Sequence, residues 1–201
     1  MPDIYTINKR DEQYPSSLTR FLGPDAPGSI WAIGNLDILR EKKTAFFCSS
    51  KCPGDLIIKT YDLAKKWRDD GVTIIGGFHS PLERECLTIL LRGKQTVILC
   101  PARSIEGMRV KGEQRKPLEE GRLLLLSPFP AKDRRVTTDT ASIRNRFVAA
   151  LCDDIFVSHA APEGKTEKFC LDIPTWGKPA ATIDSPLNEN LIKSGGRAVR
   201  L

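Results

Sequence analysis

Short apolar stretches alternate with amphipathic stretches along the chain from residue 44 onward. Two of them, Val97-Ile98-Leu99 and Leu123-Leu124-Leu125-Leu126, contain no polar residue, which is typical of parallel strands buried on both faces. Seven stretches are predicted to be strands: Thr44–Ser49, Val72–Gly76, Gln95–Cys100, Leu123–Ser127, Asp154–His159, Pro179–Ile183 and Arg197–Leu201. Strands that alternate with helices predict a Rossmann-like α/β fold, a mostly parallel sheet of about seven strands with helices on both faces.

The amphipathic stretches are predicted to be helices. The main ones are Asp55–Asp70, Ser80–Arg92 and Thr138–Leu151. In the first helix, Ile57, Tyr61, Ala64 and Trp67 recur at three-to-four-residue spacing, so we expect them to form its buried stripe.

The first 43 residues lack this regular alternation. The segment Tyr14-Pro15-Ser16-Ser17-Leu18 favours a short helix, and Ile30–Asn35 favours a short extended piece. We therefore divide the chain into an N-terminal extension, residues 1–43, packed on a Rossmann-like domain, residues 44–201.

Two long connections, residues 101–120 and 127–140, are rich in Arg, Lys, Pro and Gly. Connections of this length in a compact domain usually line sites or interfaces. Their basic residues are candidates for contacts with a nucleic-acid backbone: Arg103, Arg109, Lys111, Arg134 and Arg135.

Composition narrows the choice of partner and location. Lys plus Arg exceed Asp plus Glu by 31 to 25, and the resulting net charge of +6 favours anionic partners. The six cysteines are scattered, so we expect them to be reduced; Cys48 and Cys52 lack the further ligands of a metal site, and neither a metal nor a cofactor is expected. No stretch approaches the roughly 20 apolar residues of a membrane span, so we expect a cytoplasmic protein without a membrane partner.

Candidate phosphate-binding residues follow the predicted strands, at the edge of the sheet where open α/β proteins bind ligands. After the first strand come Ser49, Ser50 and Lys51. Small hydroxyl residues let the backbone approach a phosphate, and the helix that follows offers free N–H groups at its N-terminus.

The second strand ends in the turn Gly76-Gly77-Phe78-His79. Paired glycines permit a tight turn, and His79 either donates to a phosphate in the crevice or makes a hydrogen bond within the loop. Ser80 and Glu83 have the spacing of a capping box, so we assign Glu83 mainly to helix capping.

A third turn, Gly164-Lys165-Thr166-Glu167, follows the strand that ends at His159. It looks like the end of a Walker loop, but His159 stands where that loop requires a glycine, which excludes a P-loop nucleoside triphosphatase. The alternatives are a compact anion cradle, with Lys165 and Thr166 reaching a phosphate, and an ordinary helix start.

The fourth candidate is Arg144-Asn145-Arg146, inside a predicted helix. Two arginines separated by one residue do not share a helix face, so we expect at most one of them to point at a ligand. Asn145 is a poor helix former, which indicates a local role.

Taken in order, these features resemble the DNA-processing protein A (DprA/Smf) family. The residues that carry the resemblance are Tyr14, Pro15, Leu18, the piece from Ile30 to Gly34, Ser49-Ser50-Lys51, Gly76-Gly77-Phe78-His79-Ser80, Arg144-Asn145-Arg146, Gly164-Lys165-Thr166, Asn188, Asn190, Leu191, Ile192 and Gly195. The Arg-Asn-Arg match is unaltered, whereas the turns carry Cys, Lys, His and Glu where the family usually has Gly, Arg and Ala. The resemblance implies an extended Rossmann-like core in a short, divergent branch.

The resemblance also implies a function. Members of that family bind single-stranded DNA and help to load a recombinase, so we expect non-catalytic binding of single-stranded DNA in recombination or DNA uptake, a recombinase partner and a homodimer.

Two alternatives stay open. One is a nucleotide-binding sensor or a nucleotide-processing protein similar to the phosphoribohydrolases, which carry a catalytic Glu a few residues beyond the Thr of the third turn; here Phe169 takes that place and Glu167 directly follows Thr166. The other is a structural protein that leaves the turns empty.

Overall fold

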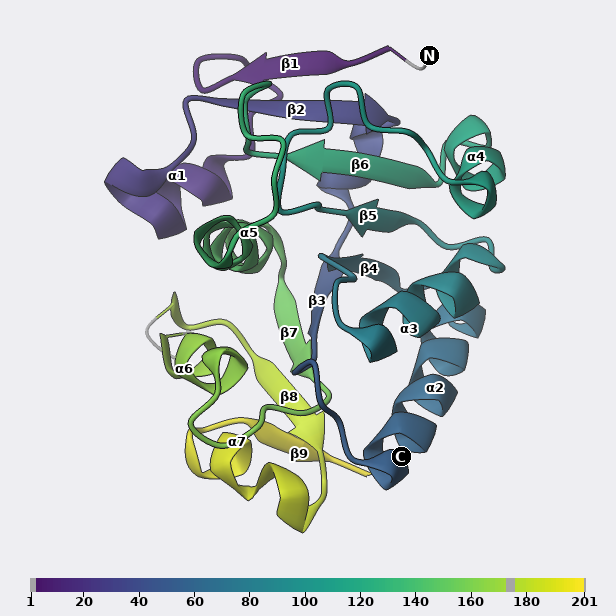
Figure 1. The fold of residues 1–201 in the computed structure, drawn as a ribbon, viewed down its shortest axis with the longest axis vertical. Helices are drawn as coiled ribbons and strands as arrows, with labels where there is room; N and C mark the ends of the chain where they lie inside the picture. The colour runs from purple at the N-terminus through teal and green to yellow at the C-terminus, as the bar shows by residue number, and fades with distance from the viewer. Residues whose placement is uncertain (1–2, 173–175, 201) are drawn as a thin grey trace.

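Nine strands form one sheet in the computed structural model, which describes residues 3–172 and 176–200. The strands are β1 (Tyr5–Asn8), β2 (Ser29–Gly34), β3 (Lys43–Phe47), β4 (Thr73–Gly76), β5 (Val97–Leu99), β6 (Leu123–Ser127), β7 (Asp154–Val157), β8 (Ala180–Ile183) and β9 (Arg197–Val199). Their spatial order is β1-β2-β6-β5-β4-β3-β7-β8-β9, which runs from top to bottom in Figure 1. All neighbours from β6 to β9 pair in parallel, and β2 pairs antiparallel with both β1 and β6.

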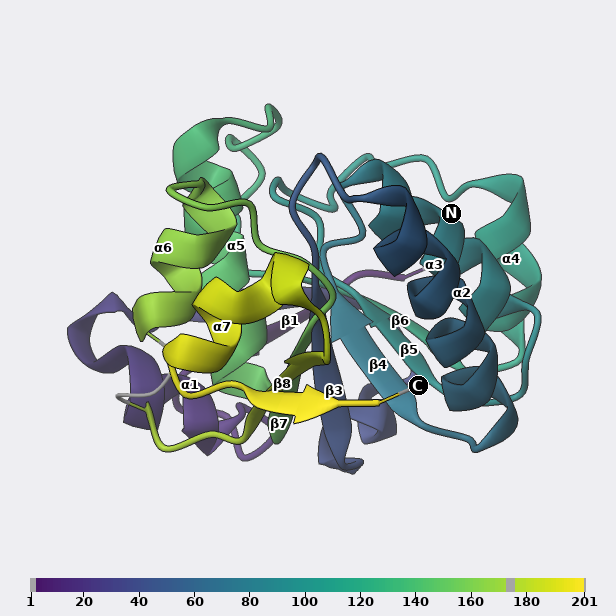
Figure 2. The same cartoon turned by 90° about the horizontal axis from the view of Figure 1, so that it is seen from below.

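Helices cover both faces of this sheet. They are α1 (Ser16–Leu22), α2 (Gly54–Asp69), α3 (Pro81–Leu91), α4 (Gly112–Glu119), α5 (Thr138–Leu151), α6 (Lys165–Asp172) and α7 (Glu189–Lys193), with 3-10 turns η1 (Gly23–Asp25), η2 (Leu36–Arg40) and η4 (Pro186–Asn188). Figure 2 shows α2, α3 and α4 on one side of the sheet and α1, α5, α6 and α7 on the other.

The apolar core has two halves because the central strands are buried on both faces. Ala45 and Phe47 of β3 pack toward α5, whereas Phe46 packs toward α2 and α3. Trp67 of α2 meets Phe46 edge to face, with ring centroids 5.5 Å apart. Side chains that alternate along a strand thus fill both layers, as a parallel sheet covered on both sides requires.

The predicted α/β class and the mostly parallel sheet are confirmed. Each of the seven predicted strands overlaps a strand of the structure, although Leu201 lies outside the described residues. The N-terminal residues add β2, which overlaps the extended piece predicted there, and β1, which we did not predict. The boundary predicted after residue 43 lies at the start of β3 and stays a prediction.

Two local predictions were wrong. The connection 101–120 contains α4, whose charged residues and internal Pro117 hide any helical periodicity in the sequence. In α2 the buried stripe is shifted, because Leu56, Thr60 and Leu63 are buried beside Ala64 and Trp67, while Ile57 and Tyr61 are only partly buried. Within residues 3–172 and 176–200, no helix is long and apolar enough to cross a membrane.

Candidate functional site

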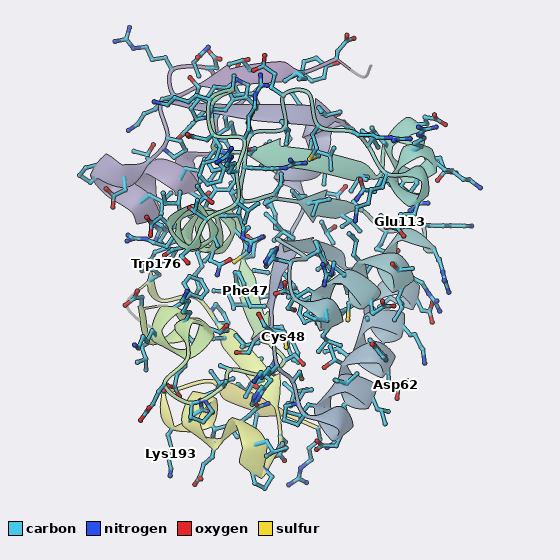
Figure 3. The ribbon with its side chains drawn as sticks, in the orientation of Figure 1. Phe47, Cys48, Asp62, Glu113, Trp176 and Lys193 are labelled. Carbon is cyan, nitrogen blue, oxygen red and sulfur yellow. The ribbon has the colours of Figure 1, made fainter. Side chains whose placement is uncertain are left out.

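A cleft of about 990 Å³ opens at the carboxyl ends of β3, β4 and β7. Its walls come from the end of β3, the β4–α3 turn, the first part of α5 with the residues before it, and α6. Phe47 and Cys48, where β3 passes into its loop, belong to this wall and lie near the middle of the molecule in Figure 3. Of the predicted site residues, the cleft is lined by Ser50, His79, Arg144, Asn145, Arg146, Lys165 and Thr166.

Arg144 is the buried cation of the cleft. Its side chain is only 5% exposed, and its guanidinium donates from Nη1 to the carbonyl oxygen of Cys100 (3.2 Å) and from Nε to Oδ1 of Asn145 (2.8 Å). Burial lowers the pKa of the guanidinium, and the negative charge of Glu83 opposes that shift. An arginine stays protonated in proteins, so the cleft wall holds a fixed positive charge.

Gly77 is needed because Arg144 lies against it. A Cβ atom built at Gly77 would overlap the Arg144 guanidinium, and one built at Gly76 would come within 3.2 Å of the Phe46 carbonyl oxygen. Among the non-glycine residues of this turn, Phe78 has a left-handed φ of 46°. The paired glycines therefore serve close approach, and the tight bend that we assigned to them falls on Phe78.

Glu83 binds the backbone of two turns. One carboxylate oxygen accepts from the N–H of Cys48 (2.9 Å), and the other accepts from the N–H groups of His79 (2.7 Å) and Ser80 (2.9 Å). The Ser80 hydroxyl accepts from the N–H of Glu83 in return, which confirms the predicted capping box. The bond to Cys48 goes beyond a cap because it ties the β3 loop to the β4 turn.

Both arginines of the Arg-Asn-Arg sequence line the cleft, and the expectation that at most one of them points at a ligand stays a prediction. Arg144 is buried, whereas Arg146 lies more exposed at the wall and pairs with Asp25 at 3.7 Å. Long side chains reach around a helix, and this allows two positions on different faces to approach one cavity. Asn145 orients Arg144 by accepting its Nε hydrogen bond.

The three predicted site residues of the β3 loop, Ser49, Ser50 and Lys51, make different contacts. The Ser49 hydroxyl is buried and accepts from the N–H of Ala161, so it joins the β3 and β7 loops. Ser50 lines the cleft. Lys51 is exposed and lines a separate, smaller depression near Tyr61 and Arg84.

The β7–α6 turn brings Lys165 and Thr166 to the cleft. Gly164 lies behind them, and a Cβ atom there would come within 2.8 Å of the Ala161 carbonyl oxygen. Lys165 Nζ donates to the Thr138 hydroxyl at 3.2 Å, across the cleft from α6 to α5. As at the other turn, the residue beside the glycine, Glu163, has the left-handed φ of 59°.

Glu167 is turned away from the cleft. Its carboxylate accepts from the N–H of Glu163 at 2.6 Å and from the side-chain amide of Asn190. Phe169, two residues further along α6, lines the cleft and packs edge to face on Phe47, with ring centroids 5.0 Å apart. Phe169 thus places an aromatic ring in the cleft wall, at the sequence position where a resemblance to the phosphoribohydrolases would require a carboxylate.

Several residues of the site were missed by the sequence reasoning. Lys168 and Phe169 line the cleft, and their spacing from Lys165 along α6 was a usable signal, since residues three and four apart share a helix face. Asn188 holds the end of β7 by donating to the carbonyl oxygens of Ser158 and Ile183, which nothing in the local sequence indicates.

The five basic residues of the long connections do not line the cleft. Arg134, for example, donates to the carbonyl oxygen of Ala131 in its own turn. Their contact with a nucleic-acid backbone stays a prediction. In the described part of the chain, no group of three or more His, Cys, Asp or Glu side chains is arranged to hold a metal.

Comparison with known families identifies the sequence. The family model of DNA recombination-mediator protein A matches residues 5–166, which include all of the predicted site residues. A search of curated proteins found no match.

Solved structures share the fold. DNA processing protein A from Streptococcus pneumoniae superposes with a TM-score of 0.81 at 18% identity, covering 98% of this chain and 71% of that one. The protein of that name from Helicobacter pylori, described for its single-stranded DNA binding mode, gives 0.76 at 17% identity, with 98% and 93% covered. The molybdenum cofactor carrier protein from Chlamydomonas reinhardtii is more distant, with a TM-score of 0.55 at 13% identity over 80% of this chain and 91% of that one.

Proposed function

Because the chain belongs to the DNA recombination-mediator protein A family, we propose that its cleft binds the backbone of single-stranded DNA without catalysing a reaction. The structural relative from Helicobacter pylori is described as binding single-stranded DNA, which supports the same class of ligand here. The proposed contacts are Arg144 and Lys165 to phosphates, with Ser50, His79 and Thr166 as further donors.

The buried guanidinium of Arg144 is the observation that carries this proposal. A charge that is 5% exposed is costly to hold in a protein, and no carboxylate among the described residues forms an ion pair with it. Two of its N–H groups have neutral acceptors, and the guanidinium borders an open cleft. A phosphate anion in the cleft would supply the negative partner that the Arg144 guanidinium lacks among the described residues.

The walls of the cleft suit a polymer backbone more than a hydrolysis reaction. Its cations come from both sides, with Arg144 and Arg146 on α5 and Lys165 and Lys168 on α6. The position of the hydrolase carboxylate is taken by Phe169, and Glu167 is held by Asn190 outside the cleft. Binding is therefore better supported than nucleotide hydrolysis.

Fluorescence anisotropy with a labelled oligothymidine strand tests the proposal. Four cations line the cleft, so if each meets one phosphate, the logarithm of the affinity should fall with the logarithm of the salt concentration with a slope of about −3. Duplex DNA of the same length should bind more weakly. An affinity that does not change with salt, or an unchanged affinity in Arg144→Ala, would overturn the proposal.

The wider role is part of the proposal. Family membership supports a function in recombination or DNA uptake, a recombinase as the protein partner, a homodimer and a cytoplasmic location. Sedimentation at several protein concentrations tests the dimer, and co-sedimentation with a bacterial recombinase on single-stranded DNA tests the partner.

A further inference from the structure

We infer that Glu83 determines the ligand specificity of the cleft, because its carboxylate fills the backbone cradle that would otherwise bind a terminal phosphate. This inference rests on the proposed function in so far as the cleft binds a phosphate backbone. It adds a preference for internal phosphodiesters over strand ends and free nucleotides.

The cradle is built from backbone N–H groups of two turns. Those of His79 and Ser80 belong to the turn that enters α3, and that of Cys48 begins the β3 loop. N–H groups at the entry to a helix, together with those of a neighbouring strand-end loop, form a typical binding site for a phosphate group.

Glu83 occupies this cradle from inside the protein. Its two carboxylate oxygens accept all three N–H groups at 2.7 to 2.9 Å, and the residue is 6% exposed. It also belongs to the wall of the cleft, beside Ser80 and Arg144. The carboxylate thus stands where a phosphate entering from the cleft would bind, and it already makes the charge-assisted hydrogen bonds that such a phosphate would make.

Filling the cradle changes which phosphates can bind. A terminal phosphate carries up to two negative charges and is usually held by several backbone N–H groups, which here are taken. An internal phosphodiester carries one charge and can be held by side chains alone, such as those of Arg144 and Lys165. The negative charge of Glu83 also opposes a dianion more strongly than a monoanion.

The first test opens the cradle. In Glu83→Ala the three N–H groups are freed beside Arg144, so we expect affinity for inorganic phosphate and adenosine monophosphate, measured by calorimetry, to rise at least tenfold over the wild type. Glu83→Gln, which keeps the shape of the side chain and loses its charge, should show a smaller rise in the same direction. Folded variants that gain no affinity would overturn the inference.

The second test needs no variant. Two oligothymidine strands of equal length, one with a 5′-phosphate and one with a 5′-hydroxyl, should bind the wild-type protein with affinities within threefold of each other. A threefold or greater preference for the 5′-phosphate would show that the cradle is open to terminal phosphates, and would overturn the inference even if the variants do not fold.

The two proposals can fail separately. If the wild type binds neither strand, the proposed DNA function fails, and the gain of phosphate binding in Glu83→Ala still decides whether Glu83 fills a phosphate cradle. If both strands bind and the variants gain nothing, the DNA function stands and the role of Glu83 fails.

Discussion

The guanidinium of Arg144 occupies the space into which any side chain at position 77 would project. Gly77 is therefore the partner of Arg144, and the two residues meet although 67 positions separate them in the sequence (144 − 77). The contact brings the α5 helix to the β4 turn and places the buried cation in the cleft.

Gly77→Ala should damage both stability and binding. The added methyl group overlaps the Arg144 guanidinium, and overpacking of this kind costs about 1–3 kcal/mol. Displacing Arg144 should also weaken single-stranded DNA binding, as measured by anisotropy beside urea denaturation. Gly54→Ala is the matched control, because a Cβ atom at Gly54 meets nothing within 4 Å. Equal stability of the two variants would contradict the prediction.

Lys165→Ala should weaken DNA binding, whereas Lys51→Ala should change it little. Both lysines are exposed and follow parallel strands, Lys51 in the loop after β3 and Lys165 at the start of α6 after β7, but only Lys165 lines the cleft. Loss of one phosphate contact should lower affinity about tenfold at low salt, which corresponds to about 1.4 kcal/mol. Titration of both variants with the same oligothymidine strand checks this. A larger loss in Lys51→Ala would move the binding site to the smaller depression.

Thr182→Val should stabilise the protein by about 1 kcal/mol, because the buried Thr182 hydroxyl has no hydrogen-bond partner among residues 3–172 and 176–200. Thr60→Val is the opposite case: its buried hydroxyl donates to the Leu56 carbonyl oxygen at 2.6 Å and contacts the Ser158 hydroxyl. That variant should lose about 1–3 kcal/mol, since it leaves polar partners unsatisfied. Urea midpoints measure both, and shifts of the same sign would refute the argument.

Stability should fall as the pH rises above 9. Burial raises the pKa of the Cys100, Cys152 and Cys170 thiols from 9.0 to about 12. Below pH 9 these thiols are protonated in both states and have no effect. Between pH 9 and 12 they lose protons only in the unfolded chain, which favours unfolding by about 1.4 kcal/mol per thiol at pH 10.

Urea denaturation at pH 8 and pH 10 measures this loss. In Cys100→Ala, which has one titrating thiol fewer, the drop in unfolding free energy between the two pH values should be smaller by about 1.3 kcal/mol than in the wild type. An unchanged drop would mean that the Cys100 thiol ionises as readily in the folded protein as in the unfolded one.

The fold class and most of the strands could be predicted from local patterns along the chain. Apolar runs such as Leu123–Leu126 are typical of strands in a sheet covered on both faces, and such a run is visible in the local sequence. The capping box of Ser80 and Glu83 could also be predicted from the sequence, because its two partners are three residues apart. Helix α4 could not be predicted from the sequence, since most of its residues are polar or charged and it contains Pro117.

The assembly of the site could not be predicted in this way, because it depends on contacts between elements that are distant in the sequence. Gly77 had a local explanation, a tight turn, yet its neighbour Arg144 comes from another element. Glu83 had a local role as a cap, yet one of its oxygens also accepts a hydrogen bond from the N–H of Cys48, in the loop that follows the neighbouring strand β3. Lys51 and Lys165 follow strands in the same way, and only one lines the cleft. Spacing along the chain predicts contacts within a helix or turn, whereas contacts between elements depend on how they pack.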